Sequence, residues 1–292
     1  MKGAELVKLG YSTIEKIRQA LACRKLLLEK NALVGVQYYE DFQEKMSRDE
    51  AQQIGTYVYH CLRSEDFFIR LLIKVNLNYK GQIISNACWE QYPDAEVSIM
   101  GSFRRGNDSC GDVDILIVHE KFNFTTPPGA IDELVECLRR RGHISDHLTH
   151  VNKKNYNIDR SSHLPKSQMY MGVFISPITK GKKRRIDIKF YPYRERAFAT
   201  LYFTGNAHFN RSMRLWANKQ RRMILDDHGL YKQDNFGKVI KHERVEAKSE
   251  KVVFDVLNLV YREPRQRDSF DAVIEKGSSK LEFIENSKKL YS

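Results

Sequence analysis

Residues 101–114 read Gly-Ser-Phe-Arg-Arg-Gly-Asn-Asp-Ser-Cys-Gly-Asp-Val-Asp, and this stretch is the most informative part of the chain. A Gly-Ser turn, two arginines, a further glycine and two aspartates are the groups that hold a triphosphate and its metal ions. Asp112 and Asp114 lie at the start of an apolar run, Val-Asp-Ile-Leu-Ile-Val, whose length and branched residues predict a buried strand. Side chains on a strand repeat every second residue, so both carboxylates are expected on one face. They repel each other unless a cation lies between them, and Mg²⁺ is the natural candidate.

The composition suits a polyanionic partner. Lys and Arg number 49 and Asp and Glu number 37 among the 292 residues, which gives a net charge of +12. An acidic membrane surface would attract the same charge, but no apolar run approaches the roughly 20 residues that span a bilayer, and the first residues lack a secretory pattern. We therefore expect a soluble, intracellular protein. The five cysteines are odd in number and never spaced as Cys-x-x-Cys, which indicates neither a disulfide framework nor a zinc knuckle.

Hydrophobic spacing predicts helices first and a mixture of strands and helices afterwards, so the expected fold class is α+β. Ile14, Ile17 and Leu21 recur at helical spacing without prolines, which predicts helices from residue 4 to about 70, with a second helical stretch over 47–77. The later elements are expected to be a strand over 97–100, a helix over 131–141, a solvent loop over 149–168, a basic turn over 180–185 that feeds another strand, two helices broken at Gly205 and Asn206, a hairpin region over 223–246 and a helix over 252–261.

Three histidines form a second possible metal motif. His143, His147 and His150 would share one face if they lay on a helix. No Cys or carboxylate at an established ligand spacing accompanies them, so we do not expect a zinc site there.

Four ordered segments resemble the signatures of one family, the family X DNA polymerases, to which DNA polymerase beta belongs. The catalytic signature is matched by 101–106 followed by Gly-Asp-Val-Asp at 111–114. Arg-Arg-Ile-Asp-Ile at 184–188 supplies a third aspartate on a strand, and 201–205 with 209–214 resemble the segment that selects the nucleotide. Tyr-Arg-Glu-Pro-Arg at 261–265 resembles the closing motif of the family.

The resemblance implies a domain organisation. A nucleotidyltransferase palm, with a mixed or antiparallel sheet and helices, is expected over 45–193, and a helical DNA-binding subdomain with part of a helix-hairpin-helix over 1–44. A carboxy-terminal nucleotide-selection subdomain is expected over 194–268 and a tail over 269–292. The resemblance does not extend to the family's lyase domain with its Schiff-base lysine, so we expect no deoxyribose-phosphate lyase activity.

The resemblance also implies the chemistry. Asp112 and Asp114 would bind two Mg²⁺ ions, with Mn²⁺ as a substitute, and Asp187 would bind one of them. A primer 3′-hydroxyl would then attack the α-phosphate of a deoxynucleoside triphosphate (dNTP), and pyrophosphate would leave. From the residues alone, the two aspartates of the first motif could instead be a solvated strand end or a salt-bridged pair.

Further site residues follow from the same matches. Lys45 falls where the family usually has an arginine that contacts the γ-phosphate, and the turn at 202–205 matches the one that excludes a 2′-hydroxyl. The resemblance assigns dNTP binding to Lys45, Ser102, Arg105, Gly111, Tyr202, Phe203, Gly205 and Asn210, and DNA binding to Arg185 and Arg214.

The chain departs from the family at several positions. Ala207 stands in place of an aspartate near the incoming base, and Cys110 replaces a serine. Lys189 replaces an arginine thought to restrain the third aspartate in the open state. These departures concern fidelity and base stacking more than phosphoryl transfer.

We therefore expect a monomeric, template-directed DNA polymerase that fills short gaps in base-excision repair. Its partners would be gapped or primed DNA, dNTPs and other repair proteins, with no membrane, in the nucleus or alternatively the mitochondrion. Two alternatives stay open: a template-independent, terminal transferase-like enzyme, and an inactive DNA-binding module that kept the fold.

Overall fold

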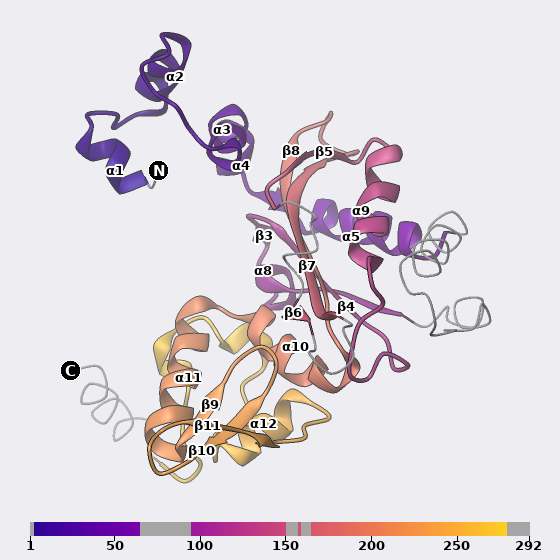
Figure 1. Ribbon diagram of the computed structural model, residues 1–292, viewed down its shortest axis with the longest axis vertical. Coiled ribbons are helices and arrows are strands. Elements are labelled where there is room, and N and C mark those ends of the chain that lie inside the picture. The colour runs from indigo at the N-terminus through magenta and orange to yellow at the C-terminus, as the bar shows by residue number, and fades with distance from the viewer. Residues whose placement is uncertain (1–2, 65–94, 150–156, 159–164, 279–292) are drawn as a thin grey trace.

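The computed structural model describes residues 3–64, 95–149, 157–158 and 165–278 of the chain (Figure 1). A group of short amino-terminal helices, a central lobe built on a sheet and a carboxy-terminal lobe follow one another in space as they do in the sequence (Figure 1). The labels below are those of Figure 1. In the described ranges no helix is long and apolar enough to cross a membrane.

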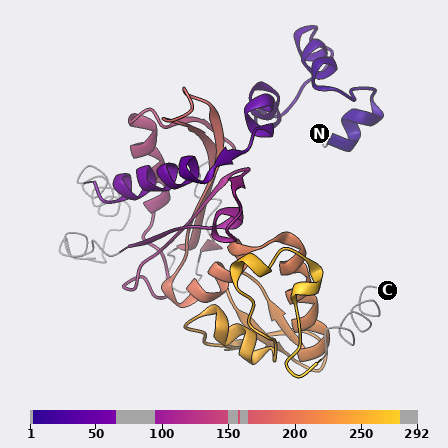
Figure 2. The same ribbon diagram turned by 180° about the vertical axis from the view of Figure 1, so that it is seen from behind.

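The amino-terminal segment is helical, as predicted. The first two of its helices stand apart from the sheet in both views (Figures 1 and 2), whereas the last one contacts the sheet, where Asp41 accepts from the amide of Lys183 (2.8 Å). Arg18 joins them through an ion pair with Glu40 (2.7 Å) and a hydrogen bond to the carbonyl of Val36 (2.9 Å). The Tyr38 hydroxyl donates to Asp146 of the central lobe (2.8 Å). The helices are α1 (Gly3–Lys8), α2 (Ile14–Ala22), α3 (Lys30–Gln37) and α4 (Tyr39–Gln43).

The central lobe contains a mixed sheet with the strand order β2-β4-β8-β7-β5, in which β6 also pairs with β7. Only β4 and β8 run parallel; the other neighbours are antiparallel. A separate two-stranded ladder joins β1 to β3. The strands are β1 (Met46–Ser47), β2 (Glu96–Ile99), β3 (Ser109–Cys110), β4 (Val113–Val118), β5 (Ile144–His147), β6 (Asn157–Ile158), β7 (Pro165–Ile175) and β8 (Lys183–Phe190).

Alternation along β4 and β8 divides the sheet into two different faces. Ile115 and Ile188 belong to the buried face, which packs on α5 (Arg48–Leu62) and α9 (Ala130–Arg140). Leu116 and Val118 lie on the opposite face and pack against Ala199 of α10 (Arg196–Thr204). Because α10 covers only part of this second face, the other part is left for polar side chains.

A buried ion pair fixes the start of β8. Arg184 donates from Nε and Nη2 to the two carboxylate oxygens of Glu50 on α5 (2.8 and 3.0 Å), and both side chains are almost fully buried. Burial alone would raise the pKa of Glu50, but hydrogen bonds from Arg184, Ser176 and Thr179 outweigh it and hold the pKa below its ordinary value. The pair therefore ties the sheet to α5 through an ionised carboxylate.

The carboxy-terminal lobe has its own core. Trp216, Phe209 and Phe254 lie in this core, and the Trp216 indole donates to the carbonyl of Leu257 (3.0 Å). Asn206 caps α11 by accepting from the amide of Phe209 (3.0 Å). Besides α10, the elements of this lobe are η2 (Tyr193–Glu195), α11 (Ala207–Arg221), β9 (Met223–Leu225), β10 (Leu230–Gln233), β11 (Val239–Arg244), α12 (Glu250–Val256), η3 (Pro264–Gln266) and η4 (Phe270–Ala272). The short helix α8 (Gly101–Arg104) belongs to the central lobe and lies at the boundary with this one.

Two sequence predictions need correction. The loop expected over 149–168 contains the short strand β6 and gives way to β7 at Pro165, because the first residues of β7 pair with β6 before the ladder with β8 begins at Gln168. The last helix ends at Val256 and not at 261, since Asn258 has a left-handed φ of 57° and Leu259 pairs with Glu275. The remainder of the helical stretch predicted over 47–77, beyond α5 and residue 64, lies outside the described residues.

The histidine motif is also not helical. His147 lies on strand β5 and His143 directly precedes it, so the two residues are spread along an extended segment and do not lie on successive turns of a helix. His143 stacks on Phe174 and His147 contacts the Tyr170 hydroxyl (2.9 Å), as ordinary packing residues do. His150 lies outside the described residues.

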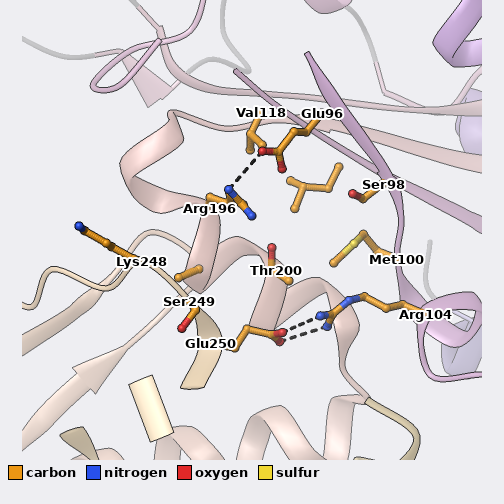
Figure 3. A pocket seen from close by; sticks show the side chains of 12 residues that line it. Glu96, Ser98, Met100, Arg104, Val118, Arg196, Thr200, Lys248, Ser249 and Glu250 are labelled. Atoms are coloured by element: carbon orange, nitrogen blue, oxygen red, sulfur yellow. Dashed lines mark hydrogen bonds and ion pairs between the residues drawn. The ribbon is translucent and has the colours of Figure 1, made fainter. Parts of the chain in front are cut away.

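Glu250 joins the two lobes by pairing with two arginines. It accepts from Arg104 at 3.1 and 2.6 Å (Figure 3) and from Arg267 at 2.5 Å. Arg267 is fully buried and lies over the rings of Phe209 and Phe254. Arg104 and Glu250 also line a cavity of about 230 Å³ between β2, α10 and the start of α12, which the aspartates of the sheet do not line (Figure 3).

We predict that Glu250→Gln destabilises the protein strongly. Removing one partner from a buried ion pair leaves the Arg267 guanidinium buried without a counter-charge, which costs about 3–5 kcal/mol. The free energy of unfolding in urea measures this cost. Glu246→Gln is the matched control, because Glu246 pairs with Arg194 and Arg244 but its side chain is 67% exposed, and a loss below about 1 kcal/mol is expected. Equal losses in the two variants would contradict the importance of burial.

A half-buried histidine makes a second contact between the carboxy-terminal lobe and the segment that follows β8. His228 Nδ1 lies 2.7 Å from a carboxylate oxygen of Glu195, and its ring stacks on Tyr191, whose hydroxyl donates to Asp227. Burial lowers the pKa of His228, but the hydrogen bond and charge of Glu195, with the charges of Asp227 and Asp226, raise it above its ordinary value overall.

This raised pKa predicts a pH-dependent stability. The ion pair contributes fully below the unfolded-state pKa of about 6.5 and is lost as the pH rises through the higher folded-state pKa. The free energy of unfolding should therefore decrease between about pH 6 and pH 9 more steeply in the parent than in His228→Gln, which cannot titrate. Parallel curves for the two proteins would show that this ion pair does not contribute.

Candidate active site

The three predicted aspartates lie on two neighbouring strands. In the parallel pairing of β4 with β8, Asp114 and Asp187 are direct partners, and Asp112 stands one position before β4. Alternation puts all three on the sheet face that α10 leaves partly uncovered. Their side chains are 29, 21 and 12% exposed for Asp112, Asp114 and Asp187, so they form the floor of an accessible site.

Each carboxylate has a basic partner from β8. Arg185 forms an ion pair with Asp112. The Lys189 ammonium lies 3.0 Å from Asp114 Oδ1 and 3.7 Å from Asp187 Oδ2, so these two aspartates share one cation. The same ammonium lies 4.1 Å from the centre of the Phe203 ring. Lys189, which the sequence marked only as a departure from the family, is therefore at the centre of the cluster.

Burial and the charges of neighbouring carboxylates raise the pKa of two of these side chains, Asp187 and Asp112. Burial raises the pKa of Asp187 to about 6; Lys189 opposes this rise, whereas the charges of Asp114 and Asp112 add to it. Burial and Asp114 likewise raise the pKa of Asp112, in spite of the Arg185 guanidinium. A cation placed between these groups would relieve both effects.

The cluster has the chemistry of a divalent cation site without the ligand geometry of one. In the described part of the chain, no group of three or more His, Cys, Asp or Glu side chains is arranged to hold a metal ion, because Arg185 and Lys189 hold the three carboxylates. The donors are nevertheless the oxygens that Mg²⁺ prefers, and the shared ammonium marks a place where a cation fits. The assignment of the aspartates as metal ligands stays a prediction.

The glycine-rich loop of the first motif lies directly against Asp114. Gly101 has a φ of +58°, and a Cβ at this position would collide with the Asp114 carboxylate. The amide of Met100 donates to the carbonyl of Asp114 (2.8 Å). Ser102, Arg105 and Gly111 follow in the same loop, and the pairing of Met46 with Cys110 brings exposed Lys45 next to Gly111. The structure thus brings the predicted triphosphate residues together beside the aspartates.

Arg105 connects this loop to the nucleotide-selection segment. Its Nη1 donates to the carbonyl of Thr204 at the end of α10 (2.6 Å), and a Cβ on Gly205 would approach the same nitrogen. Burial lowers the pKa of Arg105, although Asp114 and other acidic neighbours oppose this effect. An anion next to this half-buried guanidinium would therefore be strongly attracted.

The predicted selection residues meet where α10 ends and α11 begins. Gly205 separates the two helices with a φ of +65°, and the Gly205–Asn206 peptide is cis. Asn210 donates from Nδ2 to the carbonyl of Tyr202 (2.6 Å), and the Arg214 guanidinium lies over the Tyr202 ring (5.9 Å). The Asn210 amide is thus held by this turn, and its predicted contact with a base stays a prediction.

Sequence reasoning missed Arg104. The sequence shows Arg104 and Arg105 side by side but does not show which of them joins the lobes and which is available to a phosphate. The partner of Arg104, Glu250, is distant in the sequence. The side chain of Arg104 also donates to the Thr204 hydroxyl. No local pattern could have identified this role.

Comparison with known proteins agrees with this arrangement. The family model for the DNA polymerase beta palm matches residues 74–193, and the model for the DNA polymerase beta thumb matches residues 199–268. DNA polymerase lambda of Rattus norvegicus is 32% identical over 264 residues, which cover 89% of this chain and 38% of that protein.

DNA nucleotidylexotransferases are also similar. Identity is 28% over 281 residues for the Xenopus laevis protein and 25% over 285 residues for the Homo sapiens protein. Each alignment covers 90% of this chain and 48% of the relative, so the chain spans less than half the length of the curated relatives it matches. Because the palm and thumb models match in order and together cover more than half of the residues, the chain belongs to the DNA polymerase beta family, the family X DNA polymerases.

Proposed function

We propose that this chain carries the catalytic centre of a template-directed DNA polymerase that fills short gaps during base-excision repair. The reaction is transfer of a nucleotide from a dNTP to a primer 3′-hydroxyl, with release of pyrophosphate. The substrates are gapped or primed DNA and dNTPs, in the nucleus or the mitochondrion, where such DNA occurs. The relatives named DNA polymerase lambda and DNA nucleotidylexotransferase support DNA as the class of substrate.

One observation carries the proposal. Asp114 and Asp187 are paired on neighbouring parallel strands, next to the glycine-rich loop, and both contact the Lys189 ammonium. Asp112 adds a third carboxylate on the same face. Two divalent ions bound here would lower the pKa of the attacking hydroxyl and neutralise the leaving oxygens. Asp112 and Asp114 would hold both ions and Asp187 one of them, once Arg185 and Lys189 are displaced.

The loop residues would bind the triphosphate. The Ser102 hydroxyl and the Arg105 guanidinium would donate to phosphate oxygens, and Lys45, directly before β1, would add a positive charge. Arg105 also holds the carbonyl of Thr204 (2.6 Å), so the bound phosphates and the sugar-selecting turn are positioned by the same side chain. The position of the bound phosphates would thereby depend on the position of the turn that contacts the sugar.

The turn after α10 would select the sugar and check the base pair. Backbone at Tyr202 to Gly205 lies against C2′ and excludes a hydroxyl. Asn210 would exchange its bond to the Tyr202 carbonyl for one to the minor-groove edge of the incoming base, where every correct pair presents an acceptor. Arg185 and Arg214 would contact the DNA strands, as two of the many cations that a net charge of +12 provides.

A template-independent terminal transferase is the second candidate. Proteins named DNA nucleotidylexotransferase are 25–28% identical over 90% of this chain. Against it, the first motif opens Gly-Ser-Phe, where we expect Gly-Gly-Phe of a terminal transferase, and Arg214 is available to contact a template. A module without activity is disfavoured because all three aspartates are present.

We predict that Asp187→Ala abolishes primer extension on DNA with a one-nucleotide gap in the presence of Mg²⁺. Lewis-acid stabilisation is worth several kcal/mol, so the loss in kcat/KM should be about 100-fold or more. Asp271→Ala is the control, since Asp271 is exposed in η4 and remote from the cluster. A mutant as active as its parent would remove the proposed mechanism.

A second prediction separates the two candidate activities. With gapped DNA, the complementary dNTP should be incorporated about 10- to 100-fold more efficiently than its ribonucleotide, because a 2′-hydroxyl would overpack the turn at a cost of about 1–3 kcal/mol.

A single-stranded primer without template should not be extended. Extension of that primer would establish the terminal transferase instead.

A further inference from the structure

Arg48 fills the inner side of the glycine-rich loop. It is the first residue of α5, directly after β1. Its Nη1 donates to two loop carbonyls, those of Phe103 (2.8 Å) and Asn107 (2.9 Å). Its guanidinium lies 4.1 Å from the centre of the Phe103 ring. Among the described residues, no carboxylate forms an ion pair with Arg48.

These contacts fix the curvature of the loop. The backbone closes on itself through bonds from Gly106 to Phe103 (3.0 Å) and from Asn107 to Ser102 (3.1 Å). Arg48 then holds the carbonyls of residues 103 and 107, the two ends of this turn, on a single nitrogen. A loop held in this way cannot open without breaking two charge-assisted hydrogen bonds and a cation–π contact.

The loop distributes its consecutive side chains to three different elements. Phe103 turns toward Arg48 and the core of the central lobe, Arg104 toward Glu250 of α12, and Arg105 toward Thr204 of α10. The fixed turn therefore directs Arg105 toward the end of α10.

We infer that Arg48 is a positioning residue for the triphosphate, an inference that rests on the proposed function. It holds the 101–107 turn in the shape in which Ser102 and Arg105 meet the phosphates, without itself touching them. Contacts to the phosphates exist in the ground state and in the transition state alike, so their misplacement should raise KM for the dNTP more than it lowers kcat.

The test compares Arg48→Met, Arg48→Lys and the control Arg63→Met. Arg63 lies at the other end of α5 and also stacks on an aromatic ring, that of Tyr59 (4.6 Å), but it does not contact the loop. Binding of inorganic tripolyphosphate with Mg²⁺ is measured by calorimetry, KM and kcat for the dNTP on gapped DNA are measured separately, and the melting temperature monitors folding.

We expect Arg48→Met to weaken tripolyphosphate binding and to raise KM by about tenfold, the size expected for lost hydrogen bonds to a charged group. Arg48→Lys should recover part of this loss, because an ammonium keeps the charge and can donate to the carbonyls but cannot stack as a planar group. Arg63→Met should bind as the parent does. Such a pattern would support the inference.

Three results would overturn the inference. The first is unchanged tripolyphosphate affinity in Arg48→Met, and the second is a loss of affinity no larger than in Arg63→Met at equal stability. The third is absence of tripolyphosphate binding by the parent. Failure of the proposed function looks different, because the parent would then bind tripolyphosphate but fail to extend primers, and the affinities of the variants would still decide the role of Arg48.

Discussion

The parallel pairing of β4 with β8 is the constraint on which the candidate site depends. It places Asp114 opposite Asp187, two residues that are far apart in the sequence, and alternation along the two strands fixes the face that they share. The pairing is secured from outside the site by the buried bond between Glu50 and Arg184, which ties β8 to α5. A shift of one position would send Asp187 into the apolar face against α5 and α9, where an ionised carboxylate is not tolerated.

Bringing three carboxylates together costs free energy, and the protein offsets this cost with its own bases. Arg185 and Lys189 stand at alternate positions of β8 around Asp187, so the strand that supplies one acid also supplies the cations for all three. Burial, together with the neighbouring aspartates, raises the pKa of Asp112 and of Asp187 in spite of these bases. Lys189 also lies over the ring of Phe203, so the cluster is in contact with α10.

The loop at 101–107 contacts both the central and the carboxy-terminal lobe. Arg48 holds it from the central lobe, Arg104 bonds to Glu250 in the carboxy-terminal lobe, and Arg105 bonds to the turn after α10. A displacement of this loop would therefore alter contacts in both lobes. His228, which pairs with Glu195 inside the carboxy-terminal lobe, also stacks on Tyr191 directly after β8 and so adds a titratable group at the boundary with the central lobe.

The sequence by itself determined the elements that depend on local patterns. The alternation around Asp112 and Asp114, the helical spacing of the first segment and the break at Gly205 were sufficient to predict strands, helices and the α+β class, and the ordered motifs were sufficient to indicate the family. The end of the last helix and the start of β7 were missed because the first depends on the pairing of Leu259 with Glu275 and the second on pairing with β6, which no local pattern contains.

Only the tertiary structure decided which charges meet. Three charged side chains each contact at least one residue that is distant in the sequence. They are Lys189 between two aspartates, Glu250 between two arginines and Arg48 inside the loop. The physical reason is that the energy of a charged side chain is set by burial and by the neighbours that folding brings near it, whereas the sequence specifies only its chemical type and its position along the chain.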